Sequence, residues 1–265
     1  MKNKALIYHY LKKKIKKIEA LINTHQPHSN VTFFHLIRVE IKKLRCMIQL
    51  INFYSNKTVL KKATKPIENI FKAAGKVRSK QVEKELLDRS FKKYPLVDYQ
   101  KSLSIKLIKA KVYFNKTVTE TIDWEKIKNK FYAQLQHTKF NDFKKYQEEK
   151  LNEIKEIISM KMISEKKYHK LRMMIKNLNY HLETVSHKFS KTAILELNKL
   201  SNLLGKWHDL VSLKKSLLKL ASKNIKSPKE ISQMILVIVN LNAKSEKMLQ
   251  EINSELKTLF GYQNK

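Results

Sequence analysis

The sequence predicts an all-α protein, and three observations support that prediction. Only three glycines and four prolines occur in 265 residues, which leaves little of the turn chemistry that hairpins need. Lysine, leucine, glutamate and glutamine are abundant, and all four favour helices. Apolar residues recur at helical spacing along most of the chain. Because 42% of the residues are hydrophobic, the chain can bury a core and is no disordered basic tail.

Four helices are predicted in the first half of the chain. Polar clusters, prolines and capping residues separate them, Asn30 being the expected cap of the second. The lysine-rich run from 12 to 17 is interpreted as a solvated helix face. In the fourth helix apolar residues of 104–114 fall on both parities, so a strand stays open there as an alternative. The expected ranges are 2–23, 30–54, 66–87 and 97–116.

Further helices are predicted in the second half. The sequence Thr117-Val-Thr-Glu120 fits a capping box, so a short helix is expected from there to about Gln136. Ser164 is the expected cap of a helix beginning at 165. Ser227-Pro228-Lys229-Glu230 combines a capping box with proline in the first turn, and predicts the start of the last helix. The remaining expected ranges are 140–163, 165–188, 191–222 and 229–261.

An internal repeat organises these helices. At an offset of 134 residues, five identities fall within ten positions, and the expected caps Asn30 and Ser164 keep the same offset. A second correspondence, at an offset of 130, pairs Gly75-Lys-Val-Arg78 with Gly205-Lys-Trp-His208. We interpret this as two copies of one helical unit: residues 1–118, a connecting segment 119–139, and residues 140–265. The five identities pair His35, Arg38, Ile41, Lys42 and Leu44 with His169, Arg172, Ile175, Lys176 and Leu178.

The net charge restricts the class of partner. With 56 lysines and arginines against 23 aspartates and glutamates, the chain carries +33. Self-repulsion on that scale indicates a polyanionic partner: nucleic acid, an anionic membrane surface or polyphosphate. No apolar run approaches the length of a membrane span, and no secretory signal is recognised. With a single cysteine, Cys46, expected to be buried, the chain is predicted to be cytoplasmic.

The repeat places basic side chains along two helices. His35, Arg38, Lys42 and Arg45 are spaced at i, i+3, i+7 and i+10, so they share one face, with Lys43 beside them. The second copy repeats the first three cations but has Asn179 at the fourth place. Arginine presents a planar fork to phosphate, lysine a mobile charge, and histidine a donor whose charge responds to an anion. We therefore expect both faces to bind phosphate.

These residues resemble the CHAD domain, the conserved histidine α-helical domain. The resemblance rests on the helical segments His35 to Arg45 and His169 to Glu183, and on the segments around Gly75 and Gly205. It implies two pseudo-symmetric antiparallel four-helix bundles that enclose a basic central groove or pore holding inorganic polyphosphate, and possible targeting to polyphosphate granules. By matching positions, the implied polyphosphate-binding residues are His35, Arg38, Lys42, Lys43, Arg45, Arg78, His169, Arg172, Lys176 and His208.

No enzymatic activity, cofactor or metal is expected. The sequence contains neither a phosphate-binding GxxxxGK[ST] loop nor the acidic ExExK motif. The closely spaced His25 and His28 have no carboxylate or thiol to complete a metal site. Two alternatives to polyphosphate stay open: nonspecific binding of nucleic acid, which the charge alone would favour, and a structural adaptor at storage granules. Oligomeric state is not predicted.

Overall fold

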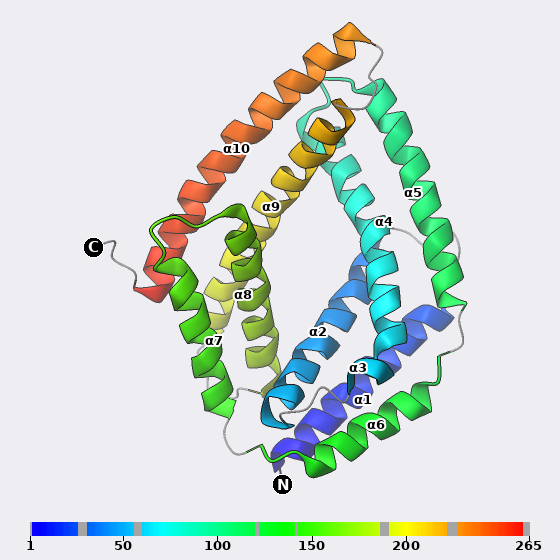
Figure 1. The fold of residues 1–265 in the computed structure, drawn as a ribbon, viewed down its shortest axis with the longest axis vertical. Helices are drawn as coiled ribbons and strands as arrows, with labels where there is room; N and C mark the ends of the chain where they lie inside the picture. Colours follow the sequence, from blue (N-terminus) through cyan, green and yellow to red (C-terminus); the bar gives the residue numbers. More distant parts are fainter. Residues whose placement is uncertain are drawn as a thin grey trace. The chain divides into compact units, whose positions relative to one another are not determined.

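The computed structural model describes residues 2–25, 31–55, 60–119, 122–140, 143–185, 191–221 and 227–261, and within these ranges it contains helices and no strand. The all-α prediction is confirmed, and segment 97–116 is helical. In chain order (Figure 1) the helices are α1 (Lys2–Asn23), α2 (Val31–Ser55), α3 (Leu60–Ala63), α4 (Lys65–Ser90), α5 (Val97–Val118), α6 (Trp124–His137), α7 (Phe143–Ile158), α8 (Glu165–Val185), α9 (Lys191–Ala221) and α10 (Pro228–Phe260).

The predicted capping box at Thr117 is wrong. Thr117 lies inside α5, where its hydroxyl donates to the carbonyl of Tyr113 at 2.8 Å. The next helix begins only at Trp124, and the Asp123 side chain caps it by accepting from the N–H of Lys126. A carboxylate at this place also interacts favourably with the helix dipole. The prediction for Thr117 is wrong because a threonine hydroxyl can also donate to a carbonyl of the preceding helical turn.

The other predicted helix ends fare better. Ser227 caps α10 as predicted, and Gly261 ends that helix in the left-handed conformation, with φ of 65°. Glu165 begins α8 directly after Ser164, whose carbonyl accepts from two N–H groups of the first turn. Asn30 lies outside the described residues. The short helix α3 has no counterpart among the predicted elements.

The chain divides into two compact units, and each is assembled from three separate stretches. The first unit comprises Met1–Arg78, Ala110–Glu153 and Asn177–Ile194. The second comprises Ser79–Lys109, Ile154–Lys176 and Leu195–Lys265. The division of the sequence into consecutive copies, 1–118 and 140–265, concerns the repeat itself and stays a prediction.

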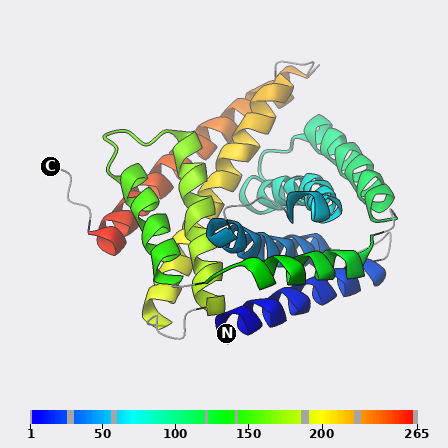
Figure 2. The ribbon, with the colours of Figure 1, turned by 60° about the horizontal axis from the view of Figure 1, so that its bottom comes forward.

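The core of the first unit forms where α1 packs against α2 and α6, which lie beside it in both views (Figure 1, Figure 2). The apolar stripe of α1 is buried, with Leu11 and Ile15 each 1% exposed. Ile41 of α2 and Phe131 of α6 are equally inaccessible. Each such side chain contributes roughly 1.5–3 kcal/mol through removal from water. The predicted amphipathic pattern of residues 2–23 therefore fixes this packing.

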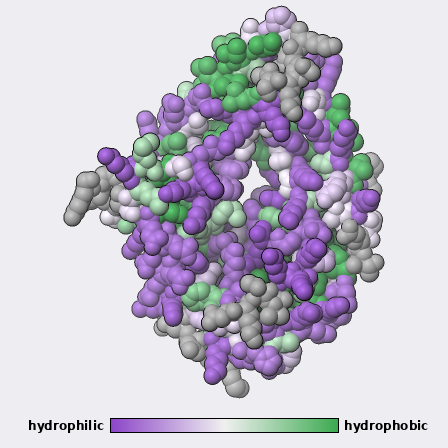
Figure 3. All heavy atoms as spheres, in the orientation of Figure 1, coloured by the Kyte–Doolittle hydropathy of each residue, from purple (hydrophilic) through white to green (hydrophobic). Residues whose placement is uncertain are grey.

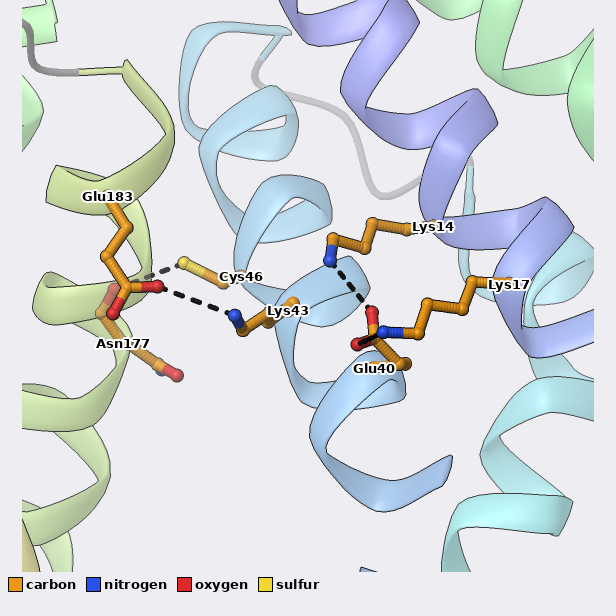
Figure 4. A network of polar contacts seen from close by, with 7 residues as sticks. All are labelled: Lys14, Lys17, Glu40, Lys43, Cys46, Asn177 and Glu183. Carbon is orange, nitrogen blue, oxygen red and sulfur yellow. Dashed lines mark hydrogen bonds and ion pairs between the residues drawn. The ribbon is translucent and has the colours of Figure 1, made fainter. Parts of the chain in front are cut away.

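The lysine run of α1 is only partly a solvated face. Lys12, Lys13 and Lys16 are exposed as predicted, but Lys14 is buried. Its ammonium donates to Glu40 of α2 at 2.8 Å, and Lys17 donates to the other carboxylate oxygen at the same distance (Figure 4). Burial opposes ionisation of Glu40, but these two hydrogen bonds outweigh it and lower the pKa of the carboxyl group. The solvated-face interpretation is therefore wrong for Lys14.

Cys46 is buried in the first unit, as predicted. Its Sγ lies 3.2 Å from the carbonyl oxygen of Asn177, to which it donates (Figure 4). Burial, with a smaller contribution from the Glu183 carboxylate, raises the pKa of the thiol to about 12. The group is thus held as a neutral thiol in the physiological range.

The second unit has its own apolar core, in which α4, α5, α9 and α10 contribute residues such as Leu87, Tyr99, Leu213 and Val237. A buried carboxylate fixes the start of α5 within it. Glu230 accepts from the backbone N–H groups of Asp98 and Tyr99 at 3.1 and 3.0 Å, so a residue of α10 caps α5.

Hydrophobic side chains also reach the surface of the second unit. In Figure 3 they gather over the beginning of α10. There Ile235 and Val239 are 56% and 57% exposed. None of the basic residues of the repeat lies on α10.

Candidate anion-binding site

The predicted site residues divide between the two units. We name those of the first unit the first basic cluster and those of the second unit the second basic cluster. Helix α2 provides five members of the first cluster and α4 provides one, whereas α8 provides three members of the second and α9 one. The first basic cluster is His35, Arg38, Lys42, Lys43, Arg45 and Arg78; the second basic cluster is His169, Arg172, Lys176 and His208.

Matched residues of the two copies are also buried to the same degree. The two histidines are exposed, the two arginines and two lysines are partly buried, and the matched isoleucines and leucines are buried in both copies. The second correspondence behaves alike: Val77 and Trp207 are buried, while Arg78 and His208 are partly buried. Helices with one apolar and one basic side orient in this way, because burying cations costs far more free energy than leaving them at the surface. The same basic face is therefore presented twice.

Arg38 is seated against α4 in the first cluster. Its Nη1 donates to the carbonyl oxygen of Phe71 at 2.8 Å, and the guanidinium carbon lies 4.2 Å from the centroid of the Phe71 ring. A Cβ at Gly75 would lie 2.4 Å from that Nη1. In a regular helix the Phe71 carbonyl also accepts from the N–H of residue 75. Glycine at this position therefore opens the second lone pair of the carbonyl to arginine.

The second cluster repeats this contact more loosely. A Cβ at Gly205 would lie 3.5 Å from Nε and 3.6 Å from Nη2 of Arg172, which is ordinary van der Waals contact. The buried Nε of Arg172 has no hydrogen-bond acceptor among the described residues. A buried donor without an acceptor costs free energy unless a ligand or water supplies one. Arg172 is thus less firmly held than Arg38.

Carboxylates accompany two cations of the first cluster. The Nε of Arg45 lies 3.1 Å from Glu68, and the Arg45 guanidinium also covers the Phe71 ring at 4.8 Å. Lys43 lies 3.5 Å from Glu183 (Figure 4). These pairs are partly exposed, so each contributes little to stability. An anionic ligand of the first cluster would have to compete with them.

Two histidines meet in the second cluster. The rings of His169 and His208 have centroids 4.7 Å apart and an interplanar angle of 33°. Nδ1 of His208 lies 3.5 Å from the hydroxyl oxygen of Ser212 and 3.7 Å from a carboxylate oxygen of Asp209. The corresponding place in the first cluster belongs to Arg78, so a permanent charge there is replaced by a titratable one.

Asn179, which stands in the second copy where the first has its fourth cation, is 2% exposed. The corresponding Arg45 has a side chain that is 35% exposed. Tyr180 and Trp207 are buried as well, at 6% and 3%. The second basic face therefore ends one position earlier than the first.

Sequence reasoning missed three parts of this arrangement. The matched glycines were noticed, but only the structure gives their purpose, which is room for the arginines. Glu68 and Glu183 lie far from the basic motif in sequence, and no signal connected them to Arg45 and Lys43. The contact of His169 with His208 could have been inferred from the repeat only if the pairing of the helices had been known.

The structure was also searched for a metal site and for membrane-spanning helices. Among the residues that the structure describes, no group of three or more histidine, cysteine, aspartate or glutamate side chains is placed to hold a metal ion. Within the same residues, no helix combines the length and apolar character that crossing a membrane requires. The chemistry that the two clusters offer is that of donors and cations for an anion.

Comparison with solved structures finds proteins of the same fold. A crystal structure of the CHAD domain from the plant Ricinus communis is similar with a TM-score of 0.67 and 14% sequence identity, over 98% of this chain and 92% of that one. PptA from Streptomyces chartreusis is similar with a TM-score of 0.71 and 10% identity, over 96% of this chain and 99% of that one. At these identities the likeness concerns the fold.

No curated protein sequence matches the chain. The family model of the CHAD domain, in contrast, matches residues 9–218, a range that contains every member of both basic clusters. The repeated helices, the glycine segments that follow them and this match lead to one conclusion: the chain belongs to the CHAD domain family.

Proposed function

We propose that this protein binds inorganic polyphosphate without catalysing its turnover, and that both basic clusters bind it. The observation that carries the proposal is the repeated seating of an arginine against a helix glycine, Arg38 at Gly75 and Arg172 at Gly205. A solvated charged face has no need to recur with the same spacing and the same burial. The family is associated with polyphosphate binding in general.

The chemistry of the clusters suits a chain of phosphates. Polyphosphate carries about one negative charge per phosphate, and neutralising several of them with lysine and arginine releases counterions, by analogy with nucleic acids. Affinity should therefore fall steeply as salt is added. Most cations of the chain outside the clusters are lysines, which support diffuse attraction more than bidentate recognition. These would accelerate encounter without choosing the ligand.

The proposal is tested by substituting one matched lysine in each cluster. Lys42→Gln with Lys176→Gln removes two charges but leaves both arginine contacts intact. The matched control, Lys13→Gln with Lys247→Gln, removes two charges from exposed lysines outside the motif. At about physiological salt the first pair should weaken binding of long-chain polyphosphate by about tenfold or more, equivalent to about 1.4 kcal/mol, and the control by much less.

The same titrations with single-stranded and duplex nucleic acid separate the alternatives. If both pairs weaken binding of every polyanion equally, the protein binds through diffuse surface charge, and nonspecific nucleic-acid binding is the better description. Release of phosphate from polyphosphate by the purified protein would overturn the non-catalytic proposal.

Bound polyphosphate should also stabilise the fold, because a ligand that binds only the native state raises the melting temperature. Localisation at polyphosphate granules is part of the proposal, whereas a structural adaptor at storage granules is an alternative to it. A fluorescent fusion that forms foci in cells containing polyphosphate, and loses them with Lys42→Gln and Lys176→Gln, would support it. Foci that persist with both substitutions would point to an adaptor held by another surface.

A further inference from the structure

The two basic clusters differ at one matched position. Arg78 and His208 each follow a glycine by three residues, and each glycine lies against the repeated arginine of its own cluster. Both side chains are partly buried. Arginine stays charged at any pH that a protein tolerates, whereas histidine titrates near neutrality. The second cluster therefore has a variable charge where the first has a fixed one.

His208 lies beside a second titratable ring. Its centroid is 4.7 Å from that of His169, and 33% of its side chain is exposed. Ser212 and Asp209 lie 3.5 and 3.7 Å from its Nδ1. Both rings can therefore exchange protons with solvent, and one of them already has a carboxylate nearby.

The remaining charged groups near this pair come from both helices that carry it. On α8, Glu165 and Lys166 lie four and three residues before His169 and Arg172 lies three residues after it, on the same side of the helix. On α9, Lys215 forms an ion pair with Glu165. From α10, Asn253 contacts this part of α8 through a neutral hydrogen bond of 2.7 Å from Tyr168. Arg172 and Lys166 are thus permanent cations of the group, and a third, Lys215, is paired with Glu165.

Charging both rings at this separation is unfavourable, because like charges repel and the effect is strong at a few ångströms. Arg172 adds to the repulsion. A bound phosphate chain reverses the balance, because its oxygens attract each imidazolium and accept a hydrogen bond from it. The state with bound anion should therefore hold more protons than the free state.

We propose that the second basic cluster is a pH-dependent phosphate site, in which the His169–His208 pair takes up a proton from solvent as polyphosphate binds. Arg78 gives the first basic cluster a fixed charge at the matched place. Binding should consequently tighten as the pH falls through the range where histidine titrates. This inference rests on the proposed function and adds a regulation to it.

The test measures polyphosphate affinity between pH 8.0 and 5.5 at constant ionic strength, with long chains so that their titratable ends are a minor fraction. For the unmodified protein the affinity should rise as the pH falls, by up to about tenfold for each pH unit over which one proton is taken up. Calorimetry in two buffers of different ionisation enthalpy counts the protons directly.

Exchanging the matched residues provides the decisive variants. His208→Arg gives the second cluster the residue of the first, and should bind tightly at pH 8 with a reduced pH dependence and reduced proton uptake. Arg78→His should weaken binding at pH 8 and increase the pH dependence. His208→Gln, which keeps a neutral polar side chain, should lose the tightening at low pH while folding normally by circular dichroism.

The outcomes separate the two proposals. If the unmodified protein and His208→Arg bind polyphosphate with the same pH dependence and the same proton uptake, the inference about the histidine pair is overturned and the proposed function stands. If the unmodified protein fails to bind polyphosphate at low salt at any pH, both are overturned.

Discussion

The two basic clusters share their spacing and burial but differ in how firmly their residues are held. In the first, Arg38 donates to a backbone carbonyl, lies on an aromatic ring and fills the space left by Gly75. In the second, Arg172 touches Gly205 only at van der Waals distance, and two histidines replace a histidine and an arginine. The repeat thus preserves the geometry of the helix pair while the chemistry of its surface varies.

The largest expected effect concerns a buried histidine of the first unit, which is distinct from the His169–His208 pair of the second unit. His181 is 0% exposed, and burial lowers its pKa to about 4. Because the unfolded chain binds a proton at its ordinary pKa of about 6.5 while the folded chain does not, stability is full above that value and falls as the pH is lowered toward 4. The loss should reach about 3 kcal/mol.

Urea denaturation between pH 7.5 and 4.5 checks this prediction. His181→Gln retains a polar group near Gln147 but cannot titrate, so its stability should lose this part of the pH dependence even if it is lower throughout. An unchanged slope would show that another group is responsible.

Arginine substitution should expose the difference in anchoring. Arg38→Ala removes a charge-assisted hydrogen bond and a cation–π contact, and should lower the free energy of unfolding by about 2 kcal/mol. Arg172→Ala removes neither of these, and also eliminates a buried unpaired Nε, so its effect on stability should be much smaller. Both variants should weaken polyphosphate binding. Equal losses of stability would contradict the claim that the two arginines are held differently.

The two glycines provide a finer comparison. Alanine stabilises a helix interior by about 1 kcal/mol relative to glycine. Gly205→Ala should realise most of that gain, because its Cβ would meet Arg172 at ordinary distance. Gly75→Ala should not, because its Cβ would force the Arg38 guanidinium away from the Phe71 carbonyl. Melting temperatures that rise equally in both variants would rule out a steric role for Gly75.

The smallest effect is expected from the carboxylates of the first cluster. Glu68→Gln releases Arg45 from a partly exposed ion pair, so the free energy of unfolding should change by about 0.5 kcal/mol or less. Polyphosphate should bind a few-fold more tightly, since it no longer competes with the carboxylate. Glu148→Gln, in an exposed pair with Lys144 outside both clusters, is a control for the change in net charge. Equal tightening in both variants would mean that Glu68 acts only through net charge.

Much of the fold and of the site follows from local sequence patterns. The apolar stripe of residues 2–23 and the serine and proline before α10 predict their helices, because periodicity and capping are local properties. The strand alternative for 104–114 is wrong. Apolar residues on both parities suggested it, but a helix can also carry apolar side chains on its exposed side, as Ile105 and Ile108 show. The predicted cap at Thr117 is wrong because its hydroxyl donates instead to a carbonyl of the preceding turn.

By itself, the sequence determined that the protein is helical, strongly basic and built on a repeated His, Arg and Lys face. Spacing along one helix decides which side chains share a surface, so the members of each basic stripe could be named in advance. Contacts between helices decided the rest: that glycine seats arginine, that Glu68 and Glu183 accompany two cations, and that His169 meets His208. Those contacts join residues far apart in the chain, and which helix faces pack together depends on the whole core.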